Sequence, residues 1–170
     1  MRYILLILFL LLSAGTAYAV DSTNSSQLEE VVVTGAREAE PLKEKPQTVG
    51  VIKQKEIKDT KPSHPSDIMN RIPGVWVNVT AGEGHITSIR QPLTTNPVYL
   101  FLEDGIPIRS TGFFNHNALY EINIPGAERI EVTKGPSTAL YGSDAIGGTI
   151  NVLTRPSPLK PEIEINPEIG

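Results

Sequence analysis

Short stretches of alternating or continuous apolar residues indicate that much of this chain forms β-strands. Val75, Val77 and Val79 take every second position, which places them on one face of a strand. Trp76 falls on the opposite face, where we expect it to pack against another part of the protein and not to contact a ligand. Residues 98–102 are apolar at each position, which predicts the buried central strand of a sheet. Strands are predicted at residues 49–52, 75–79, 86–90, 98–102, 106–108, 128–132 and 149–153.

A short helix and several turns separate these strands. Within residues 66–72 three apolar side chains share one face, Ser66 is placed to cap the start, and Pro73-Gly74 ends the helix. Glu103-Asp104-Gly105 is typical of a hairpin turn, after which residues 106–108 return as an edge strand.

The first residues have the organisation of a secretory signal. Arg2 precedes an unbroken apolar core at residues 4–12, and Ala17-Tyr18-Ala19 has the small-x-small form of a cleavage site. This core is shorter than the roughly 20 residues that a membrane-spanning helix needs. We therefore expect residues 1–19 to be a cleaved signal peptide. Residues 20–46 are expected to be a disordered arm and linker, and residues 47–156 a folded domain. Residues 43–61 are locally basic, which favours a solvated surface over the alternative of contact with anionic lipid.

Three consecutive valines lie within the predicted arm, in the run Glu29-Glu30-Val31-Val32-Val33-Thr34-Gly35. Valine favours extended backbone, so we expect an exposed strand that can pair with the sheet edge of another protein. The alternative is that the run forms an N-terminal edge strand of the folded domain itself. The polar residues before it and the Pro- and Lys-containing linker after it favour docking to a partner.

Residues 128–154 combine two strands with a tight glycine-rich crossover. In the first strand, Ile130 and Val132 fall on one face, and Glu131 and Thr133 fall on the other. Ser137 is placed to cap one helical turn within the crossover. The residues expected to shape this unit are Gly135, Pro136, Tyr141, Gly142, Asp144, Gly147 and Gly148.

This unit closely resembles the end of the plug domain of TonB-dependent outer-membrane receptors. The likeness rests on residues 128–132, 134–136, 139–142 and 143–148, with further similarity at residues 67–77 and 102–107. Two departures are present. Lys134 stands where the family more often has Arg, and lacks the planar fork that binds a carboxylate through two hydrogen bonds. Gln91-Pro92 follows Ile89-Arg90, where the family usually has Gly.

The resemblance implies an α+β plug domain with a small mixed β-sheet, short helices and Gly-rich loops. Residues 157–170 would begin a β-barrel that is otherwise missing from this chain. The plug would lie inside that barrel in the cell outer membrane, with the arm facing the periplasm. The implied function is active uptake of a scarce substrate such as a ferric siderophore or cobalamin, driven by TonB. The residues that would dock on TonB are Glu30, Val31, Val32, Val33 and Thr34.

Three loops are expected to line one end of the plug, at residues 78–85, 91–97 and 109–117. The resemblance implies that such apical loops face the outside and help to bind substrate, and the alternative is that some of them only pack against the barrel. His85 and His116 suggest an imidazole pair for a metal complex, although exposed histidines without a ligand are the simpler interpretation. Phe113 and Phe114 suit either stacking on a ligand or anchoring of the loop. The candidate substrate contacts are Glu83, His85, Thr94, Asn96, Arg109, Phe113, Phe114 and His116.

The composition argues against several other functions. The net charge of −4 gives no reason to expect nucleic acid as a partner. The chain has no Cys, which excludes thiolate chemistry, and no constellation of residues indicates an enzyme, a cofactor or a bound metal. The alternative to transport is an exported periplasmic module that binds a ligand or partner.

Overall fold

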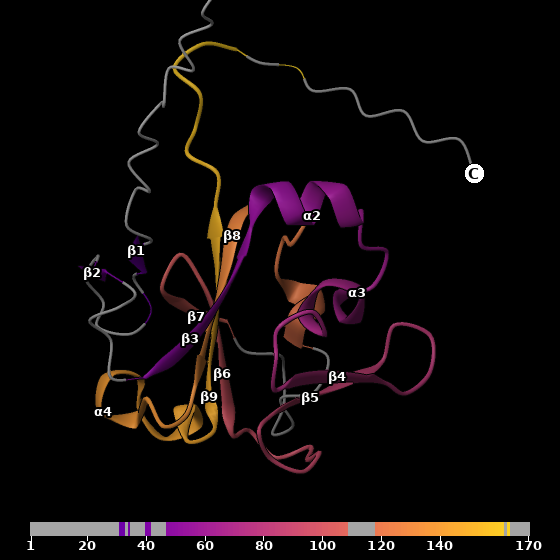
Figure 1. Ribbon diagram of the computed structural model, residues 1–170, viewed down its shortest axis with the longest axis vertical. Coiled ribbons are helices and arrows are strands. Elements are labelled where there is room, and N and C mark those ends of the chain that lie inside the picture. The colour runs from indigo at the N-terminus through magenta and orange to yellow at the C-terminus, as the bar shows by residue number, and fades with distance from the viewer. Residues whose placement is uncertain are drawn as a thin grey trace, which may run out of the picture.

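A computed structural model describes residues 31–32, 34, 40–41, 47–108, 118–161 and 163. Its centre is an open five-stranded sheet with the strand order β3-β8-β9-β6-β7 (Figure 1). Strand β9 pairs antiparallel with β8 and parallel with β6, so the sheet is mixed, as predicted. Its strands are β3 (Thr48–Lys53), β6 (Tyr99–Glu103), β7 (Ile106–Ile108), β8 (Ala127–Lys134) and β9 (Gly148–Thr154).

The prediction that residues 98–102 form the central strand is wrong, because β9 occupies the middle of the sheet and β6 lies next to it. Strand β6 is buried on both faces. Tyr99 and Phe101 belong to the main core, and Leu100 and Leu102 pack on the opposite face with Ala145. Burial on both faces explains the unbroken apolar run, but any interior strand shares this property.

The predicted hairpin between β6 and β7 is confirmed, and β7 is an edge strand. Asp104 and Gly105 both have positive φ, 51° and 79°, as a two-residue hairpin turn of this hand requires. The carboxylate of Asp104 also accepts hydrogen bonds from the backbone N–H and hydroxyl of Thr154, at 2.8 and 2.6 Å. The turn is therefore fixed to the end of β9.

One face of the sheet is covered by helices and a second hairpin (Figure 1). Helices α2 (Gln54–Thr60) and α3 (Pro65–Met69) are followed by β4 (Val75–Val79) and β5 (His85–Ile89), which pair antiparallel. A further short helix, η2 (Ala118–Glu121), belongs to the same core. Buried side chains that join this layer to the sheet include Ile57, Ile68, Met69, Val77, Ile89, Leu119, Ile130, Val132, Ile150 and Val152.

The sequence did not predict helix α2. Its residues are mostly charged or polar, and Ile57 is its only buried side chain. A single apolar position gives no helical periodicity, and the basic side chains favour a solvated surface instead. The helix ends at Lys61, whose backbone is left-handed with φ 47°.

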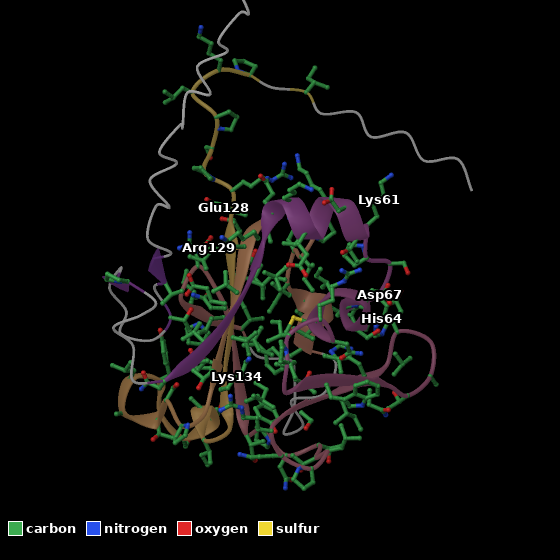
Figure 2. The ribbon with its side chains drawn as sticks, viewed as in Figure 1. Lys61, His64, Asp67, Glu128, Arg129 and Lys134 are labelled. Carbon is green, nitrogen blue, oxygen red and sulfur yellow. The ribbon has the colours of Figure 1, made fainter. Side chains whose placement is uncertain are left out.

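Helix α3 is capped by His64, not by Ser66 as predicted. The His64 ring accepts a hydrogen bond from the backbone N–H of Ser66 at 3.0 Å. Asp67 in turn accepts one from the backbone N–H of His64 at 3.0 Å, which completes a capping box. Figure 2 shows the two side chains beside α3. A histidine cap is hard to recognise from sequence because His is rare among N-cap residues.

The hydrogen bond from His64 lowers the pKa of Asp67 below its ordinary value of 3.8, with further help from Ser63. A lowered carboxyl pKa stabilises the fold above the unfolded-state value, and this stabilisation is lost as the pH falls through the folded-state pKa. We therefore expect Asp67→Asn to lower the melting temperature at pH 7, with a difference from wild type that shrinks below pH 3.8.

Thermal unfolding monitored by circular dichroism between pH 7 and 2 tests this expectation. Asp59→Asn is the matched control, because Asp59 forms an exposed ion pair with Lys55 in which 85% and 63% of the Lys and Asp side chains are exposed. A difference between Asp67→Asn and wild type that stays constant over the whole pH range would contradict the assignment.

Candidate functional site

The face of the sheet that points away from the helices carries buried polar side chains at its centre. Glu131 on β8 and Asn151 on β9 are directly opposite each other in the antiparallel ladder, and are 0% and 1% exposed. The alternation predicted for β8 is thus confirmed, since Ile130 and Val132 lie in the main core on the other face. A buried carboxylate is costly unless donors surround it, and Arg129 provides one at 2.8 Å from Nε to Oε1.

Thr34, from the predicted arm, provides two further donors. Its backbone N–H and its hydroxyl donate to Oε2 of Glu131 at 2.8 and 2.6 Å. Asn151 Nδ2 donates to the same hydroxyl at 3.0 Å, and the hydroxyl of Tyr141 donates to the Thr34 carbonyl at 2.9 Å. We call Glu131, Asn151 and Tyr141 the Thr34 clamp. Every polar group of Thr34 has a partner in it.

The predicted docking segment is partly buried in the structure. Val31–Val32 forms β1, which pairs antiparallel with β2 (Glu40–Pro41), and β1 does not join the main sheet. The prediction of an exposed strand is wrong for Val32 and Thr34, which are both 0% exposed. Glu30 and Val33 lie outside the described residues. The sequence missed the clamp because periodicity places Glu131 on a face but cannot show which distant residue covers it.

The predicted substrate contacts are only partly within the described residues. Glu83 and Asn96 are exposed, and Thr94 is half-buried, with its hydroxyl accepting a hydrogen bond from the Asn96 N–H at 3.1 Å. The expectation of an exposed histidine is wrong for His85, which is 1% exposed. Arg109, Phe113, Phe114 and His116 lie outside the described residues, and so does any pairing of His116 with His85.

His85 belongs to an aromatic cluster that the sequence did not predict. Its ring centroid lies 5.8 Å from that of His64 and 4.9 Å from that of Tyr120, both in edge-on arrangements. Its Nε2 accepts a hydrogen bond from the Leu119 N–H at 3.4 Å. His64 and Tyr120 also line a cavity with Glu83. The three residues come from separate elements, so no spacing in the sequence could have revealed the cluster.

Comparison with known proteins identifies the family. The model of the TonB-dependent Receptor Plug Domain family matches residues 41–149. This chain belongs to that family. A vitamin B12 transporter (BtuB) of Vibrio vulnificus is 42% identical over 133 residues, and that of Photobacterium profundum is 33% identical over 139. These matches cover 76% and 82% of this chain but only 21% and 23% of the transporters, so the chain spans less than a quarter of their length.

Solved structures show the same fold. The ferripyoverdine receptor of the Pseudomonas aeruginosa outer membrane, in a crystal structure with ferripyoverdine bound, is 26% identical with a TM-score of 0.58. The siderophore receptor PiuA of Acinetobacter baumannii is 28% identical with a TM-score of 0.51. The matches cover 75% and 68% of this chain, and 16% and 15% of the receptors. The α+β plug fold predicted from the sequence is therefore confirmed.

The glycine-rich crossover of the plug has the predicted form. It contains α4 (Thr138–Tyr141) and η3 (Ser143–Ala145), although the Ser137 side chain makes no capping hydrogen bond. Gly148 has φ 149°, and a Cβ there would collide with the carbonyl of Thr133 on the neighbouring strand. A Cβ on Gly147 would collide with the ring of Tyr99. These two glycines allow the crossover to enter β9 directly between β8 and β6.

Lys134, the departure from the family pattern, lies at the end of β8 and is 9% exposed. Burial, with the cation of Arg90 nearby, lowers its pKa below 10.5. Within the part of the plug that the structure describes, no group of three His, Asp or Glu side chains could hold a metal ion. None of the helices in that part is long and apolar enough to cross a membrane.

Proposed function

We propose that this chain is the plug region of an outer-membrane receptor that takes up a scarce substrate with energy supplied through TonB. The observation that carries the proposal is the family match over residues 41–149, together with 42% identity to a vitamin B12 transporter. The relatives are transporters and receptors, not enzymes, and the proposed function includes no chemical step on the substrate.

The proposed TonB-docking segment comprises Glu30, Val31, Val32, Val33 and Thr34. Extended backbone in this run can add a strand to an exposed sheet edge on TonB, with main-chain hydrogen bonds supplying the affinity. In the structure Val32 and Thr34 are buried, so docking requires the segment to leave the plug first. The Thr34 clamp is the set of contacts that must open.

The apolar side chains that remain exposed support a plug that is covered by another part of a receptor. Trp76, Val79, Ile106 and Ile146 are 54%, 50%, 66% and 53% exposed. Scattered exposed apolar residues are ordinary, but Trp is large and usually well buried. We propose that Trp76 packs against the wall of a barrel in the outer membrane, and that the loops holding Glu83, Thr94 and Asn96 face the substrate.

Cobalamin is the first substrate to test, because the relatives of highest identity reported above are vitamin B12 transporters, and ferric siderophores are the second. We expect disruption of the gene that encodes this chain to abolish uptake of one radiolabelled substrate by whole cells, and the intact gene to restore it. Unchanged uptake of every cobalamin and ferric siderophore tested would contradict transport and would favour a periplasmic binding module.

A further inference from the structure

Two histidines lie in contact where α3, β5 and η2 meet. The ring centroids of His64 and His85 are 5.8 Å apart in an edge-on arrangement. His64 immediately precedes α3 (Figure 2), and His85 begins β5. His85 also reaches η2 through a hydrogen bond to Leu119, which lies 34 positions further along the chain. The pair therefore connects three elements that are separate in the sequence.

His64 uses its Nδ1 atom as a hydrogen-bond acceptor. The backbone N–H of Ser66 donates to Nδ1 at 3.0 Å, and this bond caps α3. The Ser66 hydroxyl, 2.7 Å from the same atom, can donate or accept, but a backbone N–H can only donate. In the neutral ring the proton is therefore on Nε2, which is buried without a hydrogen-bond partner among the described residues. A second proton, on Nδ1, would remove the cap of α3.

His85 is an acceptor through its other nitrogen. Its Nδ1 lies 3.3 Å from the carbonyl oxygen of Glu83, which can only accept, so Nδ1 carries the proton in the neutral ring. Nε2 is then the acceptor for the backbone N–H of Leu119 at 3.4 Å. His85 is 1% exposed, so a proton added to Nε2 would break this bond and place a cation in a buried site.

Both rings thus hold this part of the plug together only in their neutral forms. Positive charges on both rings, 5.8 Å apart, would add repulsion between them. Histidine is the side chain whose ordinary titration falls between pH 5 and 8. We propose that His64 and His85 form a pH switch, which joins α3, β5 and η2 while both rings are neutral and opens when either ring takes up a proton.

The other ionisable groups around the pair do not reverse this dependence. Asp67 and Glu83 are carboxylates that attract a cation, but both are exposed to water and salt, which screen their charges. Asp67 already accepts the backbone N–H groups of Ser63 and His64 at 3.1 and 3.0 Å. Burial, and next the charge of Glu83, raise the pKa of Tyr120 above 10.0, so its phenol stays neutral wherever imidazoles titrate. The loss of acceptors inside the cluster therefore sets the direction, and acid opens the switch.

The size of the effect follows from proton linkage. In an opened segment an imidazole titrates at about pH 6.5, its ordinary value. If the closed form excludes the added proton, lowering the pH from 7.5 to 5.5 makes opening about tenfold more favourable for each ring. The inference concerns contacts within the plug and is measured without transport, so it succeeds or fails separately from the proposed function.

Native-state hydrogen exchange tests the switch at the backbone N–H groups of Ser66 and Leu119. After correction for the intrinsic exchange rate, opening at both amides should increase about tenfold between pH 7.5 and 5.5, while amides of β9 keep their protection. Long-range ¹H–¹⁵N NMR spectra at pH 7.5 should show the proton on Nε2 of His64 and on Nδ1 of His85. Opening that does not change with pH, or the opposite tautomers, overturns the proposal.

Three variants complete the test. Asn and Gln can place an oxygen where His has Nδ1 and Nε2, respectively, and neither side chain titrates. His64→Asn is expected to keep Ser66 protected and to remove most of the pH dependence at that amide, since Asn is a favoured N-cap. His85→Gln is expected to do the same at Leu119. His116→Asn is the matched control, because it removes the last of the three histidines, and it should retain the wild-type pH dependence.

Two results with these variants would refute the switch. One is equal pH dependence of Ser66 exchange in His64→Asn and wild type, and the other is loss of that dependence in His116→Asn. His85 is fully buried, so the wild-type spectra and His64→Asn decide the question even where His85→Gln does not fold.

Discussion

Thr34→Val is expected to release the N-terminal arm from the plug. The substitution keeps the shape of the side chain but removes the hydroxyl that donates to Glu131 at 2.6 Å and accepts from Asn151 at 3.0 Å. Hydrogen bonds to a charged group contribute about 1.5–3 kcal/mol each. A loss of about 2 kcal/mol raises the equilibrium for local opening roughly thirtyfold.

Native-state hydrogen exchange measures this opening at the backbone N–H of residue 34, which donates to Glu131 at 2.8 Å. Exchange at this amide should accelerate in Thr34→Val, while amides of β9 keep their protection. Thr34→Ser is the matched control, because it retains the hydroxyl and should exchange at nearly the wild-type rate. Equal protection of residue 34 in the Val and Ser variants would show that the clamp does not hold the arm.

Val32→Pro is expected to abolish uptake in a full receptor that carries this plug. Proline removes the backbone N–H that strand addition to TonB requires and fixes φ near −65°. Val32 lies in β1, which pairs with β2 and not with the five-stranded sheet. The fold of that sheet and binding of substrate to the receptor should therefore survive.

Uptake of labelled substrate by whole cells, with substrate binding measured on the same cells, separates the two activities. Val32→Thr is the control, since threonine is also β-branched and keeps the N–H. Expected results are normal binding and no uptake for Val32→Pro, and both activities for Val32→Thr. Uptake by Val32→Pro at the wild-type level would refute the docking assignment for this segment.

Local pattern was sufficient to predict most of the fold. Alternation at Ile130 and Val132 gave the correct core face of β8, and Asp104-Gly105 gave the correct hairpin, because both depend on neighbours in sequence. Helix α2 could not be predicted, because Ile57 is the one buried side chain of this helix and a single apolar position gives no helical pattern. The position of β6 within the sheet could not be predicted, because strand order depends on how the whole chain pairs.

The sites were less predictable than the fold, because they join residues that are distant in sequence. Thr34 and Glu131 are 97 positions apart, and no period in the chain connects them. A signal was nevertheless present: Glu131 is a carboxylate on an interior strand, and such a group requires a partner on the non-core face. The capping role of His64 could not be predicted, because it depends on the orientation of the imidazole ring, which a sequence pattern does not show.

The position of the Thr34 clamp determines where tension on the arm enters the plug. Glu131 and Asn151 belong to β8 and β9, which are joined along seven residue pairs, whereas the clamp holds Thr34 by four hydrogen bonds. The arm is thus attached to the sheet more weakly than β8 is attached to β9. Under rising tension we expect the hydrogen bonds to Thr34 to break first, which lengthens the extended arm before the two strands separate.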